Sequence, residues 1–194
     1  MSKDIDDPVA LLSDYIRGIK GEAEKVLDPI EKIHSTGRDI PHSTRLSVGH
    51  LYLFTYNPAT KRKLPYYDTL PLMLMLERKN DGFFGMNLHY LDPRLRTSIL
   101  NRLVSSRLQE NDEFARLRID YDYLKDKPQY IPLVPCYKYY RFNRVSSKVV
   151  EIEFEDWSTV AAMPIEIFRK SSKRRVFADS RKMIREEKKR RGKN

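Results

Sequence analysis

The chain has 194 residues, enough for one domain with a substantial core, and its single cysteine excludes an internal disulfide framework or a multi-cysteine zinc site. It has no apolar run of about 18 residues, so no segment is expected to cross a membrane. The acidic start lacks the basic-then-apolar order of a signal peptide, which predicts a protein made and used inside a cell.

The net charge of +10 comes from one end of the chain. Residues 169–194 hold 13 Lys or Arg against 3 Asp or Glu, whereas the other 168 residues hold 24 of each. The sequence therefore predicts a near-neutral body that carries a basic tail.

The first 44 residues are predicted to form a helical arm. Asp7 and Pro8 are suited to the N-cap and first position of a helix whose apolar residues recur at helical spacing. The polar, turn-rich stretch 35–44 would link this arm to the body.

From Gly49 the apolar pattern becomes that of strands. Strands are predicted in GHLYLFTY (49–56), PLMLMLE (71–77) and FFGMNLHY (83–90). The first two are separated by a long basic loop, and KNDG forms a tight hairpin turn between the second and third.

Helical signals follow. Asp92 and Pro93 predict the start of a helix over 93–108, and a second helix is expected over 112–124. Prolines 128, 132 and 135 predict an extended passage.

The remaining elements are two strands and two short helices. The strands are expected in CYKYYRFNRV (136–145) and KVVEIEF (148–154), and the helices over 156–163 and after Pro164. A polar helix or tail would end the chain from Asp179.

These elements predict an α+β fold. Its core would be a small, strongly bent, barrel-like sheet of the Src-homology type with flanking helices. The expected division is a helical arm at 1–44, a core domain at 45–168 and a basic C-terminal tail at 169–194.

The sequence does not indicate an enzyme or a cofactor. Its four histidines, including His89, lack metal-ligand spacing, and glycine-rich phosphate loops are missing. The carboxylates Asp120 and Asp122, and the alternating set Glu151, Glu153 and Glu155, are better read as solvated faces. A metal-dependent nuclease using them is only a remote alternative.

Basic residues are the strongest candidates for a binding site. YKYYRFNR (137–144) interleaves rings with cations, as single-stranded nucleic acid requires, but an ordinary strand with rings inward and cations outward is the favoured interpretation. The tail suits phosphate backbones, but it also suits an acidic groove on a partner protein, with Val176, Met183 and Ile184 as apolar anchors. Simple solvation of the tail is a third reading. The candidate residues for binding nucleic acid or a partner are Lys61, Arg62, Lys63, Lys138, Arg141, Arg144, Lys173, Arg174, Arg175, Arg181, Lys182, Arg185, Lys188, Lys189, Arg190 and Arg191.

Four motifs resemble a poorly characterised family of virion or assembly proteins of large contractile-tailed bacteriophages. They are LYLFTYNPATKRKLPYYDTLPL, DGFFGMNLHYLDPRLR, EDWSTVAAMPIEIFRK and VFADSRKMI, and the resemblance covers roughly residues 45–184. It implies a role at the head–tail junction or baseplate, or in handling packaged DNA ends. It carries over no catalytic residue.

The main prediction is a non-enzymatic virion structural or assembly protein that binds neighbouring virion proteins within an oligomer or hetero-assembly. It would be made in the host cytoplasm and reside in the virion. The alternative is a protein that binds packaged or terminal double-stranded DNA through its basic tail.

Overall fold

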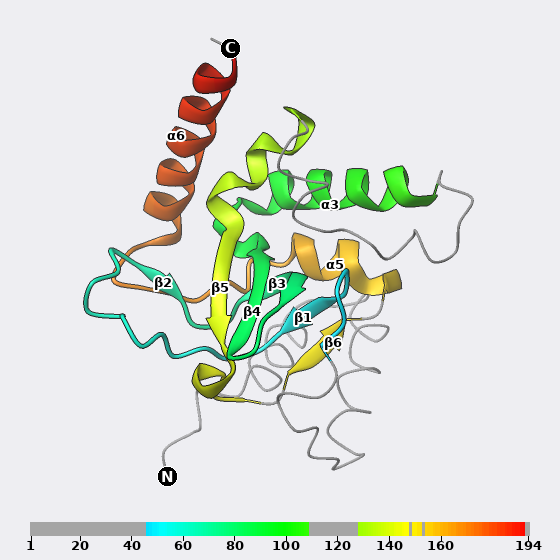
Figure 1. Ribbon diagram of the computed structural model, residues 1–194. Coiled ribbons are helices and arrows are strands. Elements are labelled where there is room, and N and C mark those ends of the chain that lie inside the picture. The colour runs from blue at the N-terminus through cyan, green and yellow to red at the C-terminus, as the bar shows by residue number, and fades with distance from the viewer. Residues whose placement is uncertain (1–45, 109–127, 148, 153, 193–194) are drawn as a thin grey trace, which may run out of the picture.

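The computed structural model describes residues 46–108, 128–147, 149–152 and 154–192. The predicted N-terminal arm and the predicted helix over 112–124 lie outside these residues. The predicted α+β class is confirmed, with one antiparallel sheet, a small second sheet and helices that include a long C-terminal one (Figure 1).

The main sheet has five strands in the order β5-β4-β3-β1-β6. It is open, with β5 and β6 at its two edges, so the described strands do not close into the predicted barrel. A second sheet pairs β2 with β7. The strands are β1 (Leu51–Leu53), β2 (Tyr67–Asp68), β3 (Leu72–Arg78), β4 (Gly82–Asn87), β5 (Tyr137–Arg141), β6 (Val150–Ile152) and β7 (Phe168–Arg169).

Helices cover one face of the main sheet and extend beyond its end (Figure 1). The α-helices are α3 (Pro93–Leu108), α5 (Trp157–Ala162) and α6 (Lys173–Arg191). Shorter 3₁₀ turns are η1 (Leu88–Tyr90), η3 (Pro128–Cys136), η4 (Phe142–Arg144) and η5 (Phe154–Asp156).

Strand β3 is apolar on both faces because both are buried. Leu72, Leu74 and Leu76 point into the core under the helices, whereas Met73 and Met75 join an aromatic cluster on the opposite face. The two-residue period of a strand thus divides one apolar run between two cores.

The hairpin of β3 and β4 was predicted correctly, and its close packing depends on two glycines. A Cβ on Gly82 would lie 2.1 Å from the Tyr140 carbonyl oxygen, and one on Gly85 would lie 2.3 Å from the Met73 sulfur. The register shifts between Met75 and Glu77, opposite the second glycine, which places the bulge on β3.

Two local predictions were wrong. Residues 128–136 form the 3₁₀ helix η3 rather than an extended passage, because the fixed φ of proline also suits a 3₁₀ turn. No helix begins directly after Pro164; the chain instead reaches the short strand β7, and the next helix, α6, begins at Lys173 rather than at the predicted Asp179.

Candidate nucleic-acid interface

The basic loop between β1 and β2 is held by a lysine far along the chain. Lys61, Arg62 and Lys63 are exposed in a turn. The Lys170 ammonium donates hydrogen bonds to the carbonyl oxygens of Arg62 and Leu64, each at 3.0 Å. Lys170 has a φ of 66°, in the left-handed region that costs a non-glycine residue free energy. The strained residue before α6 thus fixes the loop beside that helix.

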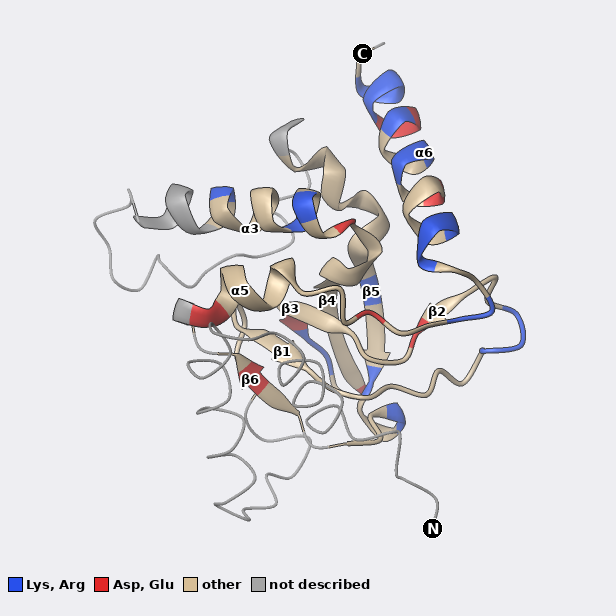
Figure 2. Cartoon of the chain, turned by 180° about the vertical axis from the view of Figure 1, so that it is seen from behind, with Lys and Arg blue, Asp and Glu red and all other residues tan. Residues whose placement is uncertain are grey.

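Helix α6 presents most of the basic residues. Its N-cap is Ser172, whose hydroxyl accepts a hydrogen bond from the Arg175 amide. Val176, Ser180 and Ile184 are buried along one side. Since these residues are four apart, they share one side of the helix, and most of the cations at the other positions are exposed. Figure 2 shows Lys and Arg recurring along the length of α6. The exposed cations of the helix are Lys173, Arg174, Arg175, Arg181, Lys182, Arg185, Lys188, Lys189 and Arg190, with Arg191 partly buried.

The acids near α6 form ion pairs with only part of its cations. Hydrogen bonds from Arg190 and Arg191 lower the pKa of Glu187 to about 2, so the C-terminal turn carries its own counter-charge. Arg181 lies 3.8 Å from Asp92 and Lys182 lies 3.9 Å from Glu186, both at the surface. Several other cations of the helix form no ion pair with a described residue. They include Arg174, Arg185, Lys188 and Lys189.

The predicted ring-and-cation segment forms the edge strand β5 and the turn η4. Tyr140 is buried, whereas Tyr139 is 41% exposed and its hydroxyl bonds Asp81. Arg141 is exposed and lies 3.8 Å from the same aspartate. Arg144 is exposed in η4. Rings therefore occur on both faces of the strand. The segment matches neither an ordinary strand with its rings inward nor a surface that presents all its rings to single-stranded nucleic acid.

Lys138 is half-buried and has no carboxylate partner among the described residues. Its ammonium donates to the Pro135 carbonyl oxygen at 2.7 Å and lies 4.2 Å from the centre of the Tyr90 ring. Burial lowers the pKa of Lys138, with the nearby Cys136 acting in the opposite direction.

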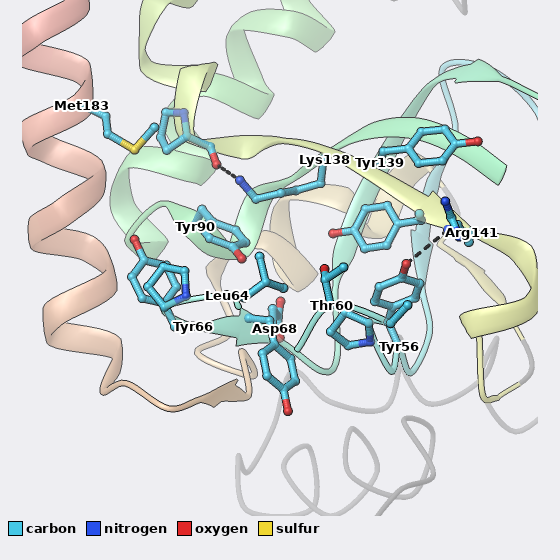
Figure 3. Close-up of a pocket in the computed structure, with 16 residues that line it drawn as sticks. Tyr56, Thr60, Leu64, Tyr66, Asp68, Tyr90, Lys138, Tyr139, Arg141 and Met183 are labelled. Carbon is cyan, nitrogen blue, oxygen red and sulfur yellow. Dashed lines mark hydrogen bonds between the residues drawn. The ribbon is translucent and has the colours of Figure 1, made fainter. Parts of the chain in front are cut away.

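A pocket of about 540 Å³ connects the three basic segments. Thr60 and Leu64 line it from the two ends of the loop, Lys138 and Arg141 from β5, and Met183 from α6 (Figure 3). Its remaining wall is mostly aromatic. The tyrosines are Tyr56, Tyr66, Tyr67, Tyr90, Tyr139 and Tyr140. The structure thus brings loop, strand and helix to one place. Of the candidate cations only Lys138 and Arg141 line the pocket, whereas Lys61–Lys63, Arg144 and the cations of α6 do not.

A buried carboxylate that the sequence analysis did not identify holds β2 against this pocket. Asp68 accepts hydrogen bonds from the amides of Leu70 and Ile167, from the Asn87 side chain at 3.0 Å and from His89 at 2.9 Å. His89 is fully buried. The Asp-Pro signals of this sequence marked helix starts and the Asp-Gly signal marked a turn, but nothing in the sequence marked Asp68.

A second buried polar group links α3 to the start of α6. Arg96 donates to the Glu166 carboxylate at 2.8 Å and to the Met163 carbonyl oxygen at 2.7 Å, with both charged side chains buried. The Lys173 ammonium lies 3.4 Å from the same carboxylate. The first turn of α6 is therefore fixed to the core by charge as well as by apolar packing.

The buried Arg96–Glu166 ion pair predicts that the protein loses stability in acid. Burial alone would raise the pKa of Glu166, but the charge and hydrogen bond of Arg96 leave it below the usual 4.5. A lowered folded-state pKa contributes stability above the unfolded value, and that contribution disappears as pH falls through the folded value. We expect Glu166→Gln to be less stable than wild type at neutral pH. It should also lose less stability between neutral pH and about pH 3, which lies below the ordinary side-chain pKa values of Asp and Glu, about 3.9 and 4.3. Urea unfolding at both pH values measures this, and equal losses would contradict it.

The described residues show no group of three His, Cys, Asp or Glu that could hold a metal ion. The remote nuclease alternative therefore gains no support from this part of the chain, while Asp120 and Asp122 lie outside it. No helix among the described residues has the length and apolar character needed to span a membrane.

A cationic helix held beside a cationic loop forms a surface suited to a polyanion such as nucleic acid. Comparison with known families agrees with this. The model of the phage T4 terminal DNA protecting protein family matches residues 30–186, and the chain belongs to that family. Comparisons with curated proteins and with solved structures find no match.

The family match revises the sequence predictions. A phage protein is confirmed, and the matched region begins earlier than the predicted resemblance. The family is one of DNA-protecting proteins and not of enzymes, which confirms that the chain is not an enzyme. The match favours the alternative prediction, a protein of terminal DNA, over the main prediction of a structural contact protein.

Proposed function

We propose that this protein binds the ends of phage DNA and protects them, with the duplex phosphates held on a cationic face. This face consists of the loop residues Lys61–Lys63 and the exposed cations of α6. The observation that carries the proposal is that Lys170 ties the loop beside a helix whose outer side is rich in cations.

The charge and length of α6 fit a duplex backbone. The helix contains ten Lys or Arg and three Asp or Glu within 19 residues. At 1.5 Å per residue it is about 28 Å long. A surface of this kind contacts phosphates without reading sequence, as protection of an end requires.

The competing reading, in which α6 inserts into an acidic groove on a partner protein, is weaker. Two of its three expected anchors, Val176 and Ile184, are 0% and 8% exposed because they pack within the chain. Only Met183, at 42% exposed, is free to meet a partner. A helix held by its apolar side and presenting cations outward favours DNA as the ligand.

We propose further that the protein, made in the host cytoplasm, stays with the DNA end in the virion. The head–tail junction is the place where such an end would meet other virion proteins. The baseplate is the alternative location. Cryo-electron microscopy of purified particles tests this location. Absence of the protein from the particles would contradict the proposal.

Binding to a short linear duplex over a range of salt concentrations tests the proposed ligand. We expect the logarithm of the binding constant to fall linearly with the logarithm of salt concentration, by about 0.9 for each phosphate contact. Fluorescence anisotropy of a labelled duplex measures this. No binding at low salt would overturn the proposed function.

A further inference from the structure

The pocket beside the cationic face has the composition of a nucleotide site. Its volume of about 540 Å³ lies within the range of pockets that enclose small ligands, about 300–1,000 Å³. Figure 3 shows Tyr66 and Tyr90 on one flank and Tyr56 on the other, with Lys138 between them. A nucleotide needs an aromatic ring on which its base can stack and a cation close to its phosphate, and this pocket supplies both.

The rings are held in place before any ligand arrives. Tyr56 packs edge-on against Tyr140, with ring centres 4.8 Å apart, and its hydroxyl accepts a hydrogen bond from the Arg141 amide. The ring centre of Tyr66 lies 6.1 Å from that of Tyr90 and 6.4 Å from that of Phe168. Rings ordered in this way lose little conformational entropy when a base stacks on them.

The charges in the pocket favour an anion. The Lys138 ammonium bonds one carbonyl oxygen and faces one ring, without a carboxylate to pair with among the described residues. Asp68 also lines the pocket, but its two carboxylate oxygens already accept four hydrogen bonds. The positive charge is therefore the one available to a ligand.

We infer that this pocket binds the terminal nucleotide of a DNA strand, with its base among the tyrosine rings and its phosphate at Lys138. The inference rests on the proposed function and adds a means of recognising an end. A nucleotide within a duplex must be unstacked and unpaired to enter a pocket, whereas a terminal one frays at little cost. The cationic face would then supply affinity for any duplex, and the pocket would supply preference for its end.

The test compares two duplexes of the same sequence, one with open ends and one closed at both ends by non-nucleotide linkers. Wild type is expected to bind the open duplex about tenfold more tightly, the effect of roughly one stacked base. Tyr66→Leu and Lys138→Met should each remove most of this preference and leave binding of the closed duplex unchanged. Tyr66→Phe, which keeps the ring, should retain it, as should Arg102→Met, which removes an exposed cation of α3 outside the interface.

Deoxyadenosine 5′-monophosphate provides a readout that needs no variant. It should compete with the open duplex and not with the closed one, and deoxyadenosine, which lacks the phosphate, should compete less well. If wild type binds neither duplex, the proposed function fails. If wild type binds both equally, if the pocket variants keep the preference, or if the mononucleotide does not compete, the pocket assignment is overturned while DNA binding stands.

Discussion

Replacing Arg181, Lys182, Arg185 and Lys189 together by glutamine is expected to weaken duplex binding by at least about tenfold at moderate salt and to flatten its salt dependence. All four side chains are exposed on α6, away from its buried side. Each phosphate contact that is lost should reduce the salt slope by about 0.9. Anisotropy titrations of the variant and wild type at several salt concentrations measure both effects.

The matched control exchanges the same residues while keeping their charge. Arg181→Lys, Lys182→Arg, Arg185→Lys and Lys189→Arg should bind nearly as wild type does, since nonspecific phosphate contacts depend mainly on charge. Circular dichroism would establish that both variants keep α6. If the glutamine variant binds as tightly as the control, α6 is not part of the DNA interface.

Removing the buried guanidinium of Arg96 is expected to have the largest effect on folding. Arg96→Met leaves the Glu166 carboxylate buried, with the more distant Lys173 as its remaining ion-pair partner among the described residues. Breaking a buried pair from one side typically costs about 3–5 kcal/mol. We expect a loss near the lower end of that range, about 3 kcal/mol, because Lys173 remains. Urea unfolding measures it.

The double variant Arg96→Met with Glu166→Leu separates the cost of an unpaired charge from the loss of packing. Replacing both members of a buried pair by apolar residues is often close to neutral. The second change should therefore recover at least half of the lost stability. A single variant that loses less than about 1 kcal/mol, the scale of an ordinary hydrogen bond, would contradict the assigned role of the pair.

Local signals in the sequence predicted local structure well. Asp92 and Pro93 begin α3, and the Asp92 carboxylate accepts a hydrogen bond from the Leu95 amide as an N-cap should. The Asp81–Gly82 turn joins β3 to β4. Such features depend on residues that lie within a few positions of one another, so the sequence alone contains them.

Features that depend on distant residues could not be predicted. Whether a sheet closes depends on how its edge strands meet, and β5 and β6 contain no signal that they remain apart. The pocket likewise needs the loop tie from Lys170 to Arg62, more than one hundred positions apart. One distant contact did leave a trace. Arg96 falls at helical spacing with the buried Ile99 and Leu100, and a charge at a core position predicts a buried partner.

Protection of a linear duplex from an exonuclease is the most direct test of the central claim. A blunt-ended duplex is incubated with wild type or with the glutamine variant of α6, and degradation by a double-strand-specific exonuclease is followed over time. The account predicts that wild type slows degradation from the ends and that the variant does so far less. Both proteins should slow an endonuclease that cuts the duplex interior less than wild type slows the exonuclease. Equal degradation with and without wild-type protein, at concentrations that saturate the duplex, would contradict it.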